Sequence, residues 1–192
     1  MSDWEKAKKV LKENGIAVIP TDTIYGIVAS VYSKKAIEDI YNIKKRDISK
    51  ACIILCASLT DVENILQREL TQNEKESMDT YLQDGSRTSF VFGIDEKYKD
   101  ELKYLHRGTI SLSFRIVENK DILKGLHDLL KEVGPIIAPS ANTEGYTPAE
   151  NINEALKYFG KKVDVYIDGG RIVGKPSSVV RIYKDGRSEI LR

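Results

Sequence analysis

The segment AVIPTDTIYGIVAS, residues 17–30, places three polar side chains between two apolar runs. Thr21, Asp22 and Thr23 offer hydroxyl and carboxylate groups to a ligand. The apolar flanks indicate that these residues stand at the end of a core strand, where ligand groups gather in α/β proteins. The alternative is a turn begun by Pro20, in which the hydroxyls satisfy nearby backbone groups.

A cationic cluster follows at Lys44, Arg46 and Lys50, in the sequence KKRDISK. The pattern places it where a helix gives way to a loop before an apolar strand. Ammonium and guanidinium groups neutralise phosphate oxygens, and the planar guanidinium can bind two of them at once. The cluster therefore predicts phosphate binding. The alternative is a solvated helix end, where cations interact favourably with the helix dipole.

A third polar cluster, APSANTEGYTPAE, spans residues 138–150. A short apolar strand is expected to end here in Ser140, Ala141 and Asn142, and Gly145 adds backbone freedom. Small side chains let a ligand approach the backbone closely, while Ser and Asn supply hydroxyl and amide contacts. The alternative is an ordinary loop between a strand and a helix.

Arg115 stands inside the apolar strand sequence SLSFRI. A guanidinium in such a strand is costly unless it is paired. The carboxylate of a ligand or a fixed Asp would satisfy it. The alternative is an edge-strand side chain whose charged end reaches solvent.

Helices and strands that alternate along the chain must position these clusters. Capping boxes begin predicted helices at Ser2 and Thr71, Ser33 caps another, and Thr147-Pro148 is the expected N-cap and first residue of a helix reaching Phe159. The remaining predicted elements are a helix over 120–132 and strands over 16–20, 51–55, 88–92, 109–116, 135–138, 163–167, 177–183 and 188–191. This order, without a linker or repeat, predicts one α/β domain with a twisted mixed sheet flanked by helices.

The composition is that of a globular protein, with 41% hydrophobic and 31% charged residues. The net charge of +1 argues against a protein that mainly coats nucleic acid. Cys52 and Cys56 lie four residues apart on one strand face, too far for a disulfide, and the two histidines are distant, so buried free thiols are expected. No signal sequence or membrane-spanning run is visible, so we expect a cytoplasmic protein without a membrane partner.

Taken in order, PTDTIYG, KKRDISK, the strand with Arg115, PSAN, DGG and PSSVVRI resemble the YrdC/TsaC-like threonylcarbamoyl-AMP synthase family. The resemblance covers residues 15–192. It implies a YrdC/RibB-like fold and a single domain over residues 1–192, without the additional C-terminal domain of longer members.

The resemblance also implies a reaction. L-Threonine, bicarbonate and ATP, with Mg²⁺, give threonylcarbamoyl-AMP and pyrophosphate, so the enzyme is a nucleotidyltransferase. A downstream tRNA threonylcarbamoyl transferase complex then modifies adenosine in tRNA, and weak direct binding of tRNA or double-stranded RNA is a further expectation. Attack of a carbamate oxygen on the α-phosphate needs mainly positioning and charge neutralisation, so a nucleophilic side chain is not required.

Residue by residue, the resemblance implies two sides of one site. The catalytic cations are Lys44, Arg46 and Lys50; the L-threonine contacts are Thr23, Arg115, Ala138 and Ser177; the ATP contacts are Arg46, Lys50, Ser111, Ser140, Asn142, Pro148 and Arg192. No protein ligand for a metal is identified. The sequence departs from the family pattern at Ala51, Ser86 and Val117, where the family commonly has Pro, and at Leu55, where some members have a threonine-contacting His.

Two other functions fit the same pattern. One is a carbamoyl-adenylate-forming domain like those of hydrogenase maturation, which are normally part of larger, cysteine-rich chains. The other is a non-catalytic protein that binds RNA or a nucleotide. Pyrophosphate release that requires both threonine and bicarbonate distinguishes the three.

Overall fold

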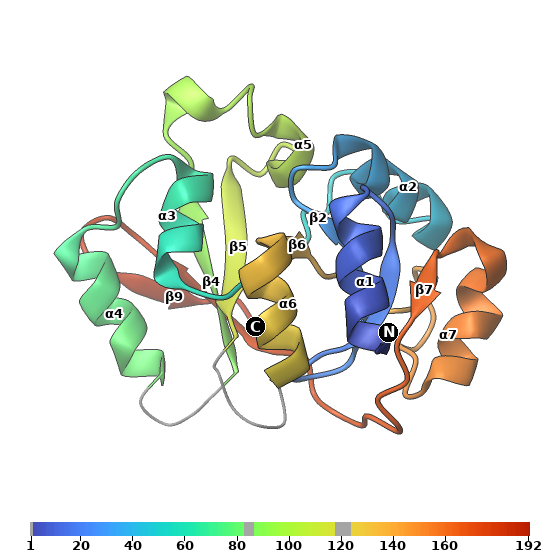
Figure 1. Ribbon diagram of the computed structural model, residues 1–192. Helices are drawn as coiled ribbons and strands as arrows, with labels where there is room; N and C mark the ends of the chain where they lie inside the picture. The colour runs from blue at the N-terminus through green and yellow to red at the C-terminus, as the bar shows by residue number, and fades with distance from the viewer. Residues whose placement is uncertain (1, 83–86, 118–123) are drawn as a thin grey trace.

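The computed structural model describes residues 2–82, 87–117 and 124–192 (Figure 1). The helices are α1 (Asp3–Lys12), α2 (Lys34–Lys44), α3 (Leu59–Leu66), α4 (Gln72–Leu82), α5 (Lys103–His106), α6 (Lys124–Val133) and α7 (Ile152–Phe159), with 3₁₀ turns η1 (Glu96–Tyr98) and η3 (Gly160–Lys162). The strands are β1 (Ala17–Pro20), β2 (Tyr25–Ser30), β3 (Ile53–Cys56), β4 (Thr88–Gly93), β5 (Ser111–Ile116), β6 (Ile136–Ile137), β7 (Val165–Tyr166), β8 (Ser178–Ile182) and β9 (Ser188–Ile190).

Within the described residues, nine strands form one sheet in the order β7-β1-β2-β6-β3-β5-β4-β8-β9. The pairs β1–β7, β3–β5 and β4–β8 are parallel, and the other neighbours are antiparallel. The predicted mixed α/β sheet flanked by helices is therefore confirmed. The assignment of residues 1–192 to a single domain stays a prediction.

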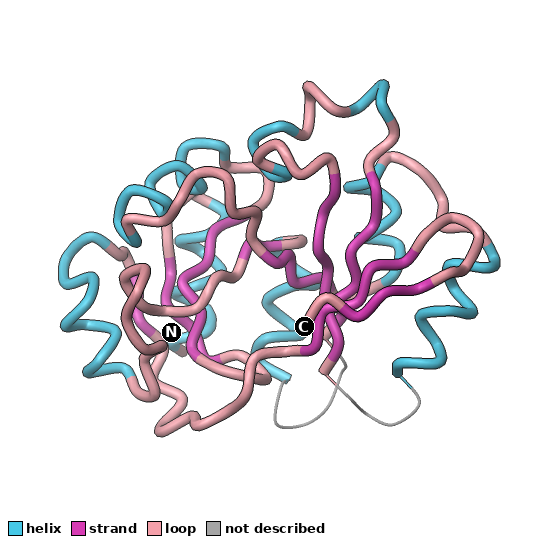
Figure 2. Tube along the Cα trace, turned by 180° about the vertical axis from the view of Figure 1, so that it is seen from behind, coloured by secondary structure: helices cyan, strands magenta, loops and turns pink. Residues whose placement is uncertain are grey.

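Strand alternation divides the sheet into two faces. Leu55, on β3, packs with α1 and α6, whereas its neighbours Ile54 and Cys56 belong to the larger core with α2, α3, α4, α5 and α7. Figure 1 shows α1 and α6 side by side in front of the sheet, and Figure 2 gives the view from behind. The face that packs against α1 and α6 is called the α1/α6 face.

The helix caps show why several elements begin where the sequence predicts. The Ser2 side chain accepts a hydrogen bond from the Glu5 backbone, and that of Ser33 accepts one from Ala36. The capping box of α4 is present, with Glu74 N to Thr71 Oγ1 at 3.1 Å and Thr71 N to Glu74 Oε2 at 2.8 Å. These three helix starts are confirmed.

The predicted start of the last helix at Thr147-Pro148 is wrong. Asn151 is the N-cap of α7, because its side chain accepts from Glu154 N at 3.0 Å and the helix begins at Ile152. Pro148 instead lines a cavity on the α1/α6 face.

Sequence reasoning also missed α3. Its capping box joins Ser58 to Asp61, a pattern that could have been read from Ser-x-x-Asp before an apolar run. The predicted helix over 120–132 is observed as α6, and its expected residues 120–123 lie outside the described residues.

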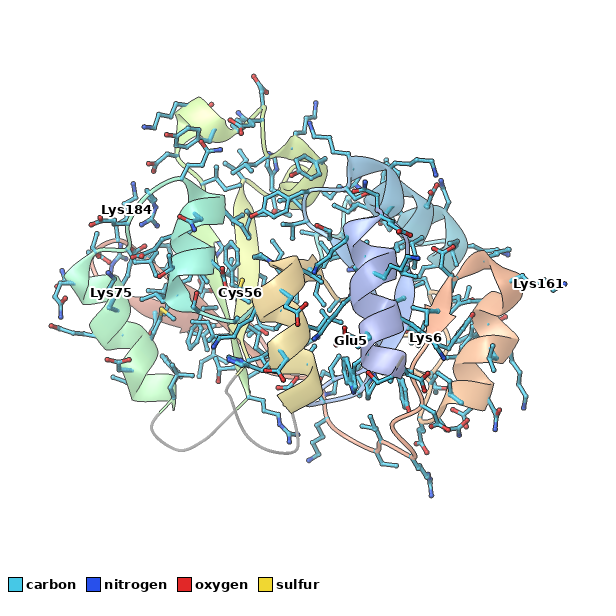
Figure 3. The ribbon with its side chains drawn as sticks, in the orientation of Figure 1. Glu5, Lys6, Cys56, Lys75, Lys161 and Lys184 are labelled. Atoms are coloured by element: carbon cyan, nitrogen blue, oxygen red, sulfur yellow. The ribbon has the colours of Figure 1, made fainter. Side chains whose placement is uncertain are left out.

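Both cysteines are free and buried, as expected. Cys56 lies in the interior, as Figure 3 shows, and its thiol pKa is well above its usual value because of burial. In the part of the chain that the structure describes, no group of three or more His, Cys, Asp or Glu side chains could hold a metal ion. No described helix has the length and apolar character needed to cross a membrane.

Candidate functional site

A cavity of about 350 Å³ opens on the α1/α6 face of the sheet. Its wall comes from all four regions that the sequence singles out, namely the turn between β1 and β2, the loop before β3, the strand β5 and the segment after β6. The lining residues are Thr21, Thr23, Ile24, Gly26, Arg46, Ala51, Cys52, Ile53, Val91, Ser113, Arg115, Ala138, Pro139, Ser140, Pro148, Pro176, Ser177, Val179 and Arg192.

The turn between β1 and β2 fulfils both roles considered for it. The Thr21 hydroxyl donates to Ile24 O at 2.6 Å and accepts from the backbone nitrogens of Thr23 and Ile24 at 3.3 Å, so it holds the turn. Thr23 is buried on the cavity wall, with its hydroxyl 3.2 Å from that of Thr21. The turn therefore presents Thr23 to the cavity and Asp22 to Arg115.

Arg115 is buried on β5, between β3 and β4, so the edge-strand alternative is wrong. Its Nη2 donates to Asp22 Oδ1 at 2.6 Å, which is the fixed Asp that the sequence allowed as a partner. Burial lowers the pKa of the Arg115 guanidinium, and the Asp22 carboxylate opposes that shift. Arginine nevertheless stays protonated at neutral pH.

Two buried polar atoms on the cavity wall have no hydrogen-bond partner among the described residues. They are Arg115 Nε and Ser113 Oγ, which lie on the same face of β5 because the side chains alternate along a strand. An unsatisfied buried polar atom costs about 1–3 kcal/mol. A polar ligand in the cavity would relieve this cost. Sequence reasoning missed Ser113, although its position two residues before Arg115 was the available signal.

The other expected threonine contacts also lie on this wall. The Ser177 hydroxyl lies 2.8 Å from that of Ser89, and the Ser177 carbonyl accepts from Arg192 Nη2 at 3.0 Å. Ala138 uses its N–H in a 2.9 Å bond to Ile53 O. Thr23, Arg115, Ala138 and Ser177 are thus brought together in one cavity.

The cations of KKRDISK have three different surroundings. Arg46 is half-buried on the cavity wall and donates to the carbonyls of Lys50 and Ala51 at 3.1 Å. Lys50 is exposed and forms an ion pair with Glu144, outside the residues that line the cavity. Of the three, Arg46 alone reaches the wall.

Lys44 is buried away from the wall, and Nζ donates to the carbonyls of Ser140 and Asn142 at 2.5 and 2.6 Å. Burial and then the charge of Arg46 lower its pKa to about 8. Lys44 therefore braces the end of α2 against the 140–142 segment.

Only some of the remaining expected ATP contacts line this cavity. Ser140, Pro148 and Arg192 line the cavity. Asn142 instead stabilises the loop, accepting from Ser140 Oγ at 2.5 Å and donating to Thr143 O and Tyr146 O. Ser111 lines a second cavity, two positions along β5 from Ser113.

The structure shows the surroundings of three of the four positions that depart from the family pattern. Leu55 is fully buried and pairs in register with Arg115, but it offers no polar contact. Ala51 lines the cavity and its carbonyl accepts from Arg46. Val117 is buried with α6, and Ser86 lies outside the described residues.

The segment 168–177 packs against the β1–β2 turn and brings Pro176 and Ser177 to the cavity wall. Tyr25 Oη accepts from Gly169 N and donates to Gly170 O, both at 2.8 Å, which fixes the DGG sequence. A Cβ at Gly174 would overlap the carbonyl oxygen of Thr23. The close approach of these two backbones therefore requires Gly at position 174.

Most of the chain is similar to known proteins. A family model named Sua5_yciO_yrdC, described as "Telomere recombination", matches residues 9–192. The threonylcarbamoyl-AMP synthase of Cellvibrio japonicus (strain Ueda107) is 24% identical over 183 residues, covering 88% of each chain.

Solved structures share the fold at low sequence identity. P. abyssi Sua5 complexed with L-threonine matches with a TM-score of 0.80 and 22% identity, over all of this chain and 54% of that one. E. coli YciO matches with a TM-score of 0.78 and 20% identity, over 98% of this chain and 87% of that one. The chain thus spans just over half the length of the P. abyssi protein.

Proposed function

The chain belongs to the Sua5/YciO/YrdC family, and from this premise we propose that it is an L-threonylcarbamoyladenylate synthase. As a nucleotidyltransferase, it would form threonylcarbamoyl-AMP and pyrophosphate from L-threonine, bicarbonate and ATP. One observation carries the proposal most directly. A buried guanidinium with an unpartnered Nε, beside an unpartnered Ser113 hydroxyl, lines a cavity of about 350 Å³.

The threonine half of the site follows from this observation. The Arg115 guanidinium matches the carboxylate of an amino acid, and Ser113 lies beside it on β5. Thr23 and Ser177 provide hydroxyl groups on the same wall, and Ala138 provides backbone. The P. abyssi Sua5 structure is described as complexed with L-threonine, which supports an amino acid as the ligand proposed here.

The reaction that these groups would serve has two steps. The threonine amine attacks bicarbonate, and loss of water leaves an N-carboxylate. One oxygen of this carbamate then attacks the α-phosphorus of ATP, so an O–P bond forms while the bond to the β-phosphate breaks and pyrophosphate leaves. The role of the protein is to position the two reactants and to neutralise charge on the phosphates.

Arg46 is the cation best placed for the nucleotide, because it is already on the wall with two of its nitrogens fixed by carbonyls. Ser140, Pro148 and Arg192 would form the rest of that side. Lys50 would join after leaving Glu144, and Lys44 would act through the loop that it braces.

The donor set of the described site fits Mg²⁺ that arrives with the nucleotide. No acidic cluster among the described residues offers a ready-made metal site, and Mg²⁺ is commonly held by substrate phosphates and water with few protein ligands. The ion would supply charge neutralisation on the triphosphate. Arg46 and Arg192 would complement it from the protein.

We place the product in tRNA modification. A tRNA threonylcarbamoyl transferase complex would consume threonylcarbamoyl-AMP in the cytoplasm, and weak contact of this protein with tRNA or double-stranded RNA remains part of the proposal.

The test is pyrophosphate release measured with each substrate omitted in turn, with the adenylate product identified by mass spectrometry. Dependence on threonine, bicarbonate and ATP together supports the proposal. Release that needs carbamoyl phosphate instead would indicate a carbamoyl-adenylate-forming domain. RNA or nucleotide binding without any pyrophosphate release would indicate a non-catalytic binding protein.

A further inference from the structure

A second cavity, of about 450 Å³, continues the ligand-binding face of the sheet. In the strand register, Val91 on β4 pairs with Ser113 on one side and with Arg181 on the other. Val91 and Ser113 line the first cavity, whereas Arg181 lines the second. Neighbouring strands are about 4.8 Å apart, so the backbone of Arg181 lies one strand away from the wall of the first cavity.

Two further pairs of residues show the same continuity. Along β8, Val179 lines the first cavity and Arg181 the second; along β5, Ser113 lines the first and Ser111 the second. Residues two apart on a strand point to the same face. Lys184, which also lines the second cavity, lies toward the opposite end of the molecule from Lys161 (Figure 3).

Arg181 carries a charge without a counterpart in the part of the chain that the structure describes. Its side chain is half-buried, its Nε is fully buried without a hydrogen-bond partner, and none of its nitrogens forms an ion pair with a described acid. The acids that line this cavity are each bound by another cation: Glu74 by Arg68, Asp95 by Lys184 and Glu96 by Lys99. The partner that Arg181 lacks is an anion.

Ser111 adds a hydroxyl group to this anion site. Its one hydrogen bond as donor is long, 3.4 Å to the Thr109 carbonyl. A hydroxyl group held so weakly can turn toward a ligand oxygen. The resemblance to known synthases implies that Ser111 contacts ATP, and Ser111 lines the second cavity. A nucleotide that spans both cavities would meet that expectation.

We propose that Arg181, with Ser111, forms a phosphate subsite that binds the β- and γ-phosphates of the nucleotide, the part that leaves as pyrophosphate. This inference rests on the proposed function for the identity of the ligand. In the first cavity Arg115 is paired with Asp22, whereas Arg46 and Arg192 donate only to backbone carbonyls and keep their charge for the nucleotide. Arg181 adds a further charge that no described acid neutralises, at the second cavity, where the end of a triphosphate would need it.

The test measures binding of inorganic pyrophosphate with Mg²⁺ by calorimetry, using the whole chain. Arg181→Ala is expected to raise the Kd roughly 10-fold, as for the loss of one charge-assisted contact. Arg181→Lys keeps the positive charge but loses the planar guanidinium, so its Kd for pyrophosphate is expected to lie between those of wild type and Arg181→Ala. The matched control is Arg187→Ala, an exposed arginine paired with Asp185 just after β8, which is expected to stay within about twofold of wild type.

Unchanged pyrophosphate affinity in folded Arg181→Ala overturns the subsite. An equal loss in Arg187→Ala also overturns it, because the effect is then one of net charge. If Arg181→Ala fails to fold, Arg181→Gln is judged by the same two criteria.

The outcome is separable from that of the proposed function. Arg181-dependent binding without threonine-dependent pyrophosphate release would retain the subsite and reject the synthase. Threonine-dependent pyrophosphate release with wild-type kinetics in Arg181→Ala, together with wild-type affinity for pyrophosphate, would retain the synthase and reject the subsite.

Discussion

Arg115 and Asp22 form a buried ion pair, with Nη2 and Oδ1 2.6 Å apart and side chains that are 7% and 8% exposed. The carboxylate engages one end of the guanidinium, and Nε is left without a partner among the described residues. Asp22 therefore holds the orientation of Arg115 without using all of its donors. The same arginine can serve both the fold and a ligand.

This relationship predicts that Arg115→Lys selectively impairs the use of threonine. The ammonium can still pair with Asp22, so the protein should fold, but the planar fork is lost. We expect the threonine KM to rise about 10-fold or more, while the Kd for ATP measured without threonine stays within about twofold. Steady-state kinetics, ATP titrations and thermal melts on the same preparation measure these quantities.

Two further variants separate the roles of this arginine. Arg115→Ala leaves Asp22 buried without its closest cation and should destabilise the fold by about 3–5 kcal/mol. Arg87→Ala removes an exposed guanidinium 4.0 Å from the other Asp22 oxygen and should leave the threonine KM nearly unchanged. A folded Arg115→Lys protein with wild-type threonine kinetics contradicts the ligand role.

Arg46→Ala is expected to weaken ATP use more than Lys50→Ala does. Arg46 is already on the cavity wall, whereas Lys50 must first leave Glu144. One charge-assisted phosphate contact is worth roughly 1.5–3 kcal/mol, so the ATP KM or kcat/KM of Arg46→Ala should change by at least about 10-fold. Lys35→Ala, which removes an exposed lysine paired with Asp39, is the control. Wild-type ATP kinetics in both Arg46→Ala and Lys50→Ala would show that KKRDISK is only a solvated helix end.

The sequence predicted elements where local chemistry decides the structure. Ser2, Ser33 and the Thr71–Glu74 box mark helix starts because a side chain accepts a backbone N–H there. The prediction at Thr147 failed because a competing local signal lies four residues further on. The Asn151 side chain accepts from Glu154 N and caps α7, while Pro148 lines the cavity.

Most of the candidate site could also be predicted, because strand ends and their polar residues converge in this fold. What the sequence could not decide is how far each side chain reaches. Lys44 and Arg46 are two residues apart, yet one is buried among carbonyls and the other faces the cavity. The partner of Arg115 was likewise undetermined, since Asp22 is distant in sequence and meets it only in the folded sheet.

Replacing both cysteines with Ala should preserve activity and remove only the packing contacts of the two thiols. Cys56 is fully buried, and Cys52 contributes its small side chain to the cavity wall with Sγ 3.4 Å from Tyr41 Oη. A stability loss of roughly 1 kcal/mol for each site is expected. Because burial raises the thiol pKa of Cys56, its alkylation should remain slow at pH 8 in the folded protein. Zinc retained through dialysis and lost in the double variant would show that the thiols bind metal.

Gly174→Ala should disturb the threonine half of the site without touching a charged group. The new methyl would overlap the Thr23 carbonyl, so the 168–177 segment or the β1–β2 turn must move. We expect a loss of roughly 1–3 kcal/mol in stability and a higher threonine KM. Gly93→Ala is the matched control, because its Cβ would meet nothing within 4 Å. Equal threonine kinetics in the two variants would show that this close approach has no role in the site.

The buried ammonium of Lys44 predicts an increase in stability at alkaline pH. Its pKa is about 8 in the folded protein, chiefly because of burial and then the charge of Arg46, whereas an unfolded lysine titrates near 10.4. Between these values the unfolded chain binds the proton and the folded chain does not, so stability rises with pH over that interval. The neutral amine still has two N–H groups for the Ser140 and Asn142 carbonyls.

Comparison with Lys44→Met isolates this effect from all other titrating groups. Met removes both hydrogen bonds and should be less stable at every pH, but it has no proton to lose. The difference in unfolding free energy between wild type and Lys44→Met should therefore grow from pH 7 to pH 10, by an amount on the order of 3 kcal/mol at most. Denaturant titrations at several pH values measure it, and ¹⁵N NMR of the lysine ammonium gives the pKa directly. A difference that stays constant across this range means that the ammonium is solvated, and Lys44 would then be free to contact phosphate instead of bracing the 140–142 segment.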